Sequence, residues 1–253
     1  MTQRIKILIA CHKPCSVPTE SCYLPVEVGA ALHAEPIRGF TRDNTGDNIS
    51  EKNKNYCELT ALYWAWKNLD ADAVGLVHYR RYFAGRLFSK RPAGEADFRK
   101  ALDRAPVILP MKRHYWIETN YSQYIHAHHT QDLETTRAVL AERCPDYLPA
   151  YDSVMQRRSG HRFNMFVMRR DCFDAWCAWL FPVLFEVERR MDITDYAPYN
   201  ARVFGFIAER LVDVWIETNR VPYTEMPVLN TESQHWIRKG TTFVLRKLGY
   251  KMR

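Results

Sequence analysis

Two consecutive arginines follow an apolar stretch in the first half of the chain. Residues 73–77 (AVGLV) have the composition of a buried strand, and they are followed directly by His78, Tyr79, Arg80 and Arg81. Guanidinium groups bind phosphate oxygens in a bidentate manner, so the pair at the end of a strand suggests a phosphorylated ligand. The alternative is that both arginines pair with carboxylates at the rim of the sheet.

A second group of candidate catalytic side chains lies near residue 130. His128 and Asp132 are four positions apart, so on a helix they share one face, where the carboxylate could orient the imidazole as a general base. The alternative is that Asp132 lies in the first turn of a helix, where the helix dipole favours a carboxylate, and that the histidines are solvated. The residue types leave both interpretations open.

The motifs of several common site types are absent from the sequence. The histidines at 126, 128, 129 and 161 belong to no H-E-x-x-H motif and to no Cys/His set with zinc spacing. Neither G-x-G-x-x-G nor G-x-x-x-x-G-K-[ST] occurs, which argues against dinucleotide oxidoreductases and P-loop enzymes. The seven scattered cysteines do not suit a disulfide framework, and we expect them to be reduced in the cytoplasm.

Alternating strands and helices are predicted around these residues in the first half. Residues 5–10 (IKILIA) and 73–77 indicate buried strands, and 56–69 (YCELTALYWAWKNL) indicate a helix with one apolar stripe. A helix near 95–104 and a strand at 106–109 continue the alternation, which predicts a parallel sheet wrapped by helices. Ligands of such sheets bind beyond the carboxyl ends of the strands, which is where the arginine pair lies.

The second half is predicted to be mostly helical and to belong to the same single domain. We expect the following elements: helices at 132–143, 149–158, about 171–190 and about 203–218, and strands at 164–168 and 227–230. Pro182 lies inside the longest helix and should kink or divide it. Residues 13–25 are expected to form a flexible loop.

The net charge of +7 is concentrated at the C-terminal end. Residues 234–253 contain six Lys or Arg and no acid, interleaved with apolar residues such as Trp236 and Phe243. This composition is typical of a segment at an anionic membrane surface, although a solvated helix packed on its own domain is the alternative. A duplex-binding protein usually spreads its cations over a folded face, so we expect no nucleic-acid partner. Without a bilayer-length apolar run or a leader, we expect a soluble, unexported protein.

The chain closely resembles a bacterial family found in capsule, exopolysaccharide and O-antigen gene clusters, long catalogued as a domain of unknown function and since assigned to glycosyltransferases. In the first half the resemblance rests on ILIACHKP (7–14), GDNISEKNKNYCELTALYWAWKN (46–68) and VGLVHYRRYF (74–83). In the second half it rests on YSQYIHAHHTQDL (121–133), HRFNMFVMRRDCFDAWCAWLFPVLFEVE (161–188) and YNARVFGFIAERLVDVWI (199–216).

The resemblance implies a GT-A-like α/β fold and a single glycosyltransferase domain over residues 1–253. Residues 1–115 would form a Rossmann-type nucleotide-sugar-binding half, 116–233 a largely helical acceptor half, and 234–253 a basic amphipathic tail. The implied nucleotide-sugar contacts come from Cys11, His12, Lys13, Asp47, Asn48, Tyr56, Glu58, His78, Tyr79, Arg80 and Arg81. We assign acceptor contacts to His161, Asn164 and Arg202.

The resemblance also implies the reaction. We predict an inverting transferase that moves a hexose from a UDP-sugar to a lipid-linked bacterial surface glycan on the cytoplasmic side of the membrane. Galactofuranose transferases belong to the family, which makes UDP-galactofuranose a leading donor candidate. Residues 78–81 occupy the place of the D-x-D metal motif of other GT-A enzymes and contain no acid, so we expect arginine to neutralise the leaving diphosphate without a metal or other cofactor.

Two points stay open at this level. For the general base we choose Asp132 with His128 beside it, and keep Glu209 as the alternative because it lies in the acceptor half. The alternative function is a catalytically silent nucleotide-sugar-binding or scaffold protein of a polysaccharide assembly complex, which would bind the donor without transferring it. A nucleic-acid binder is supported only by charge.

Overall fold

The computed structural model describes residues 3–231, so the basic tail at 234–253 lies outside the described residues. Within that range one mixed sheet forms the centre of the molecule, with strand order β10-β6-β9-β4-β1-β2-β3 and with β5 and β11 paired beside β4. Its strands are β1 (Ile5–Cys11), β2 (Tyr23–Glu27), β3 (Thr41–Arg42), β4 (Ala73–His78), β5 (Arg81–Phe83), β6 (Val107–Pro110), β9 (Phe166–Arg169), β10 (Tyr223–Met226) and β11 (Val228–Asn230). A small second sheet pairs β7 (Arg113–His114) with β8 (Ser159–Gly160).

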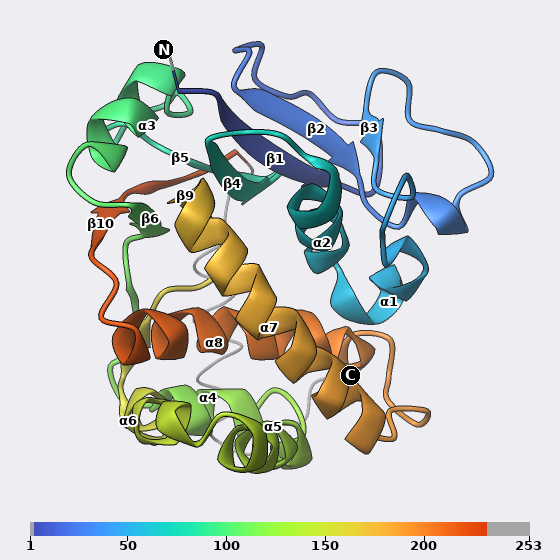
Figure 1. The fold of residues 1–253 in the computed structure, drawn as a ribbon, viewed down its shortest axis with the longest axis vertical. Helices are drawn as coiled ribbons and strands as arrows, with labels where there is room; N and C mark the ends of the chain where they lie inside the picture. Colours follow the sequence, from blue (N-terminus) through green and yellow to red (C-terminus); the bar gives the residue numbers. More distant parts are fainter. Residues whose placement is uncertain (1–2, 232–253) are drawn as a thin grey trace.

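The helices cover the sheet and extend beyond one of its ends. They are α1 (Asn53–Tyr56), α2 (Leu59–Asn68), α3 (Glu95–Leu102), α4 (Asn120–Ile125), α5 (Thr130–Arg143), α6 (Leu148–Gln156), α7 (Arg170–Arg190) and α8 (Val203–Thr218). Figure 1 shows α7 descending from β9 and crossing in front of α8, which lies below the sheet, with α4, α5 and α6 gathered in a lower layer. The second half is therefore largely helical, as the sequence predicts.

The sheet has the expected parallel core, but one strand inside it runs antiparallel. β1 pairs in parallel with β2 and β4, but β9 lies between β4 and β6 and runs antiparallel to both. The chain leaves the carboxyl end of β6, builds α4 to α6 at that end of the sheet and enters β9 from the same side. Without a crossover to the other end, the returning strand must run antiparallel.

Alternating side chains of the central strands bury both faces of the sheet. In β1, Ile7 and Ile9 face a cluster that includes Phe98 of α3, whereas Leu8 and Ala10 belong to the larger core shared with α2, α7 and α8. Successive side chains of a strand point to opposite faces, so a strand covered on both faces is apolar along its whole length. This explains why IKILIA shows no polar alternation.

Three local predictions differ from the structure. The helix expected at 56–69 is broken at Cys57, whose φ of 53° and ψ of −127° separate α1 from α2. Pro182 does not divide α7, which is continuous over 21 residues. β2 occupies part of the expected loop at 13–25, because backbone pairing with β1 orders a strand interrupted by Pro25.

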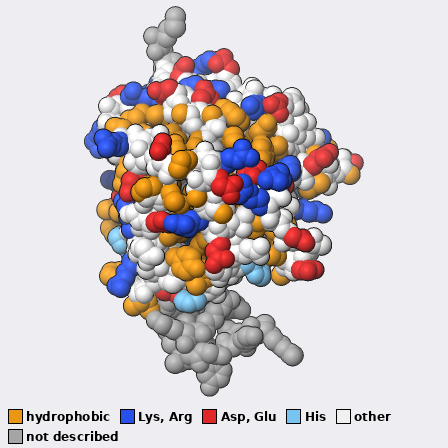
Figure 2. Space-filling model, turned by 60° about the horizontal axis from the view of Figure 1, so that its bottom comes forward, with side chains coloured by type: hydrophobic (Ala, Val, Ile, Leu, Met, Phe, Trp, Pro, Cys, Tyr) orange, Lys and Arg blue, Asp and Glu red, His pale blue; other side chains and the backbone are white. Residues whose placement is uncertain are grey.

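Among the described residues no helix has both the length and the apolar character needed to cross a membrane. Figure 2 shows acidic and basic side chains interspersed with apolar ones on the face that it presents. That face therefore lacks the continuous basic track that binds nucleic-acid phosphates.

Candidate functional site

Two hollows meet at the carboxyl ends of β1 and β4. The large hollow, of about 810 Å³, is lined by the ends of these strands, by α1 and by the segment that precedes α8. The small hollow, of about 300 Å³, is lined by α8, by the segment around Phe163 and by the chain near Arg113. Both are bordered by the same five residues, Cys57, Glu58, His78, Arg81 and Arg202, so they adjoin each other at these side chains, and we call them together the double cavity.

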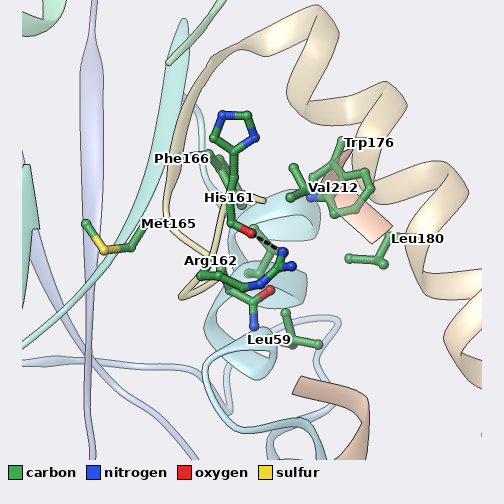
Figure 3. Close-up of a pocket in the computed structure, with 10 residues that line it drawn as sticks. Leu59, His161, Arg162, Met165, Phe166, Trp176, Leu180 and Val212 are labelled. Carbon is green, nitrogen blue, oxygen red and sulfur yellow. Dashed lines mark hydrogen bonds between the residues drawn. The ribbon is translucent and has the colours of Figure 1, made fainter. Parts of the chain in front are cut away.

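A third, separate space lies inside the core and is too small for a substrate. It measures about 10 Å³, which is enough for roughly one water molecule. Figure 3 shows that its lining comes largely from apolar side chains, among them Leu59, Trp176, Leu180 and Val212. The candidate site is therefore the double cavity at the strand ends.

The arginine pair lies where the sequence places it, at the turn between β4 and β5. Arg80 and Arg81 both line the large hollow, and Arg81 also lines the small one. The Arg81 guanidinium stacks over Phe163 at 4.4 Å, and its buried Nε finds no hydrogen-bond partner among the described residues. Burial lowers the pKa of Arg81, yet arginine stays protonated at neutral pH. An incompletely paired cation at this junction suits an anionic ligand.

Strained backbone shapes the junction between the two hollows. Phe163 and Asn164 have φ values of 77° and 51°, a region that residues other than glycine rarely adopt and that costs about 1–3 kcal/mol each. The carbonyl of Phe163 is held by the His78 ring, and the Asn164 amide donates to Glu58 (2.6 Å) and to the carbonyl of Gly205 (3.0 Å). These contacts fix the Glu58 carboxylate at the cavity wall.

Glu209 is the second carboxylate of the cavity. It projects from α8 into the small hollow, and its Oε2 lies 3.7 Å from Nη1 of Arg210. Its side chain keeps 21% exposure, so it can meet a ligand directly. Of the three candidate catalytic residues, Glu209 and His128 line the small hollow.

Asp132 lies elsewhere. Its side chain is buried in α5 and accepts hydrogen bonds from the hydroxyls of Tyr124 and Tyr196, both at 2.7 Å, and it lines neither hollow. Helix α5 begins at Thr130, so His128 precedes it and the expected shared helical face of His128 and Asp132 does not exist. The His128 ring is instead hydrogen-bonded to Asn200 (3.1 Å), and burial lowers its pKa.

The structure brings some of the other predicted nucleotide contacts to the large hollow. His12 and Tyr79 line it, with their rings edge to face at 5.2 Å, and Lys13 lies 5.6 Å from the Tyr79 ring. Burial lowers the pKa of His12, so its ring favours the neutral form. Cys11 is buried below this rim and accepts a weak hydrogen bond from the Cys15 thiol (3.4 Å).

Three further predicted contacts lie outside both hollows. Asp47 is exposed and accepts from the Tyr63 hydroxyl (3.2 Å), and the Asn48 amide donates to Gly46 (2.9 Å) within the same loop. Tyr56 is fully buried and donates to Glu188 (3.0 Å). In this conformation these side chains support the surrounding loops and helices.

The predicted acceptor residues are also divided. Arg202 borders both hollows, and Asn164 supports Glu58 from behind the wall. His161 is buried between Asp213 and Glu225, with Nε2 at 2.9 Å from the Glu225 carboxylate, and lines neither hollow. Its ring therefore joins β8, α8 and β10.

Sequence reasoning missed several cations of the small hollow. Arg113, Arg162 and Arg210 line it together with Arg81 and Arg202, against the carboxylates of Glu58 and Glu209. Arg210 falls on the buried stripe of α8, and a charged residue in such a stripe is a detectable signal of a special environment. Arg162 carries no such signal, because its burial depends on contacts with distant residues, among them Tyr115 (2.9 Å), Asn120 and the carbonyl of Glu209 (3.3 Å).

Residues 3–231 contain no cluster of three or more His, Cys, Asp or Glu side chains arranged to hold a metal ion. Apart from Lys54, the Lys and Arg side chains that line the cavity are guanidinium groups, which can bind diphosphate oxygens through paired hydrogen bonds.

The chain belongs to the family described as Domain of unknown function (DUF4422), whose profile matches residues 6–220. Its structure is similar to the solved apo structure of the WbbM bifunctional glycosyltransferase, with a TM-score of 0.84 and 31% sequence identity. The match covers 90% of this chain and 45% of that one, so the chain spans less than half the length of this neighbour. The fold is thus an α/β fold of the kind found in a glycosyltransferase. A search of curated proteins gives no match to the chain.

Proposed function

We propose that the protein is a glycosyltransferase that moves a hexose from a UDP-sugar to a growing bacterial surface glycan, by inversion and without a metal. The observation that carries the proposal is the double cavity, in which Arg81 and Arg202 border both hollows and Glu209 projects into the smaller one. The similarity to a glycosyltransferase structure over 90% of the chain supports the same class.

In the proposed mechanism the diphosphate binds the cationic junction. Arg80, Arg81 and Arg202 would neutralise the charge that develops as the bond from the sugar to the diphosphate breaks. The large hollow would hold the rest of the nucleotide beside His12 and Tyr79. Asp47, Asn48 and Tyr56 could contact it only after the loops around them rearrange.

The acceptor would enter the small hollow, where a general base must remove a proton from the attacking hydroxyl. We assign this role to Glu209, because it is the accessible carboxylate on that side of the junction. Asp132 is unsuited to the role in the observed conformation, since tyrosine hydroxyls bind both of its oxygens. Glu58, held by Asn164, would orient the donor sugar at the junction.

A panel of UDP-sugars, with GDP- and ADP-sugars as controls, tests the proposal. A ligand at a hundred times its dissociation constant adds about 2.7 kcal/mol to the stability of the folded state, which a thermal shift detects. Including UDP-galactofuranose beside UDP-galactose and UDP-glucose separates the donor candidates. Stabilisation followed by transfer to a glycan acceptor supports the enzyme, whereas binding without transfer would favour the silent binding or scaffold protein.

We predict that activity persists in excess chelator. Arginine side chains at the junction supply the positive charge that a divalent ion supplies elsewhere, so removing metal should change the transfer rate little. The measurement is the initial rate with EDTA, compared with manganese and magnesium added back. Complete loss of activity that either ion restores would contradict metal-independent transfer.

We propose that the basic tail, which lies outside the described residues, holds the enzyme on the inner face of the cell membrane. Deleting residues 234–253 removes six cations, each worth about 1 kcal/mol near an anionic surface. Binding to anionic vesicles should fall sharply, and transfer to a lipid-linked acceptor should fall with it. Transfer to a short soluble acceptor should stay near normal, and equal loss of both activities would contradict the proposal.

A further inference from the structure

The segment that joins β5 to α3 contains the most exposed large apolar side chain of the described residues. Phe88 is 97% exposed, and its neighbour Leu87 is 58% exposed. Scattered single apolar residues are common on protein surfaces, but two adjacent large ones at the tip of one loop form an apolar projection.

The backbone holds this tip in a tight turn. The amide of Ser89 donates to the carbonyl of Arg86 (3.2 Å), which closes a four-residue turn with Leu87 and Phe88 at its centre. Phe88 has a φ of 61° at the third position, where turns that need positive φ favour Gly or Asn. The Ser89 hydroxyl donates to the carbonyl of Arg91 (2.9 Å) and continues the fold of the loop. At this strained and solvated position the Phe88 ring does not contribute to the packing of the core.

The base of the loop is anchored, so only its tip projects. The amide of Ala93 donates to the carbonyl of Phe83 (2.7 Å), and that of Ala84 donates to Pro227 (2.8 Å). Ala84 and Ala93 are both buried. The loop therefore leaves β5 from an anchored base.

Positive charge surrounds the apolar tip. Arg86, Lys90 and Arg91 are exposed, and no acid occurs between Phe83 and Glu95. Within residues 3–231 none of these three cations forms an ion pair with a carboxylate. Apolar side chains flanked by cations are the composition of a segment that inserts at the boundary between anionic headgroups and acyl chains.

We propose that Leu87 and Phe88 insert into an anionic lipid surface while Arg86, Lys90 and Arg91 contact its headgroups. This surface is separate from the double cavity, and it belongs to the folded part of the chain and not to the tail. Leu87 is six residues beyond Arg81, so the two lie within roughly 20 Å even if the chain is fully extended. Insertion would therefore keep Arg81 within roughly that distance of the inserted side chains.

Vesicle binding of the full chain tests the proposal without any requirement for transferase activity. The probe is a sedimented vesicle of phosphatidylglycerol and phosphatidylethanolamine, compared with one of phosphatidylcholine alone. High salt shortens the Debye length and weakens the attraction of the tail, so the apolar contribution dominates there. Leu87→Ser/Phe88→Ser should lower partitioning into anionic vesicles at least tenfold at high salt, and Leu32→Ser, which alters an exposed apolar residue elsewhere, should not.

Phe88→Gly separates membrane binding from folding. Glycine adopts positive φ without steric cost, so this variant should melt no lower than the wild type and yet lose vesicle affinity. Replacing Arg86, Lys90 and Arg91 together by Gln should lower binding at low salt. Unchanged vesicle partitioning of the double variant would overturn the proposal. It would also be overturned if the double variant lost self-association, which would make the loop a dimer contact, or lost UDP affinity, which would make it a lid.

Discussion

Glu209→Gln should lower the turnover number by about two to four orders of magnitude, the usual contribution of a positioned general base. Glutamine keeps the size of the side chain and one hydrogen-bond acceptor but cannot take up a proton. Because Glu209 lies in the small hollow, beyond the junction at Arg81 and Arg202, UDP affinity should stay near that of the wild type. Steady-state transfer kinetics and calorimetric titration with UDP measure the two effects separately.

Asp132→Asn is the matched control, since it makes the same chemical change in a buried carboxylate of the same half. Asp132 accepts from Tyr124 and Tyr196, and an amide can accept only through its one oxygen. We expect a loss of about 1–3 kcal/mol in the free energy of unfolding and nearly normal turnover of the folded enzyme. The opposite ranking of the two variants would assign the base to Asp132, and a large effect confined to His128→Ala would assign it to the histidine.

Arg81→Ala should weaken UDP binding by roughly 1.5–3 kcal/mol, or about 10- to 150-fold, the contribution of a charged hydrogen bond. Among the described residues the Nε of Arg81 has no hydrogen-bond partner, and Arg81 borders both hollows, so its guanidinium is well placed to bind a diphosphate. Arg81→Lys should restore only part of the affinity, because an ammonium group cannot form the paired hydrogen bonds of a guanidinium. Arg80→Ala should show a loss in the same range.

The control for this series is Arg137→Ala, which removes a surface arginine paired with Asp152 on α6. Its UDP affinity should not change. Calorimetric titration with UDP, with melting temperatures to verify folding, makes the comparison. Wild-type affinity in both Arg80→Ala and Arg81→Ala, with the fold intact, would remove the diphosphate from this junction.

Local sequence patterns determined the central strands, the later helices and one part of the site. The apolar runs at 5–10 and 73–77 form β1 and β4, and the helix expected at about 203–218 is α8 with those bounds. Arg80 and Arg81 could be placed because a side chain that follows a buried strand must emerge at the edge of the sheet. The backbone and a few neighbouring side chains decide such features, so a short window of sequence contains them.

Tertiary structure decided which of the polar residues share the cavity. Arg113, Arg162 and Glu209 come from distant segments. The pairing of β7 with β8 brings Arg113 near Arg162, and the packing of α8 adds Glu209. The spacing of His128 and Asp132 could not reveal that α5 begins between them, nor that Tyr196 binds the carboxylate from 64 positions away. The direction of β9 likewise depends on the end of the sheet at which α4 to α6 are packed, because the chain enters β9 from that end. Contacts over such separations depend on the free energy of burying the whole core. A short window of sequence does not determine that free energy.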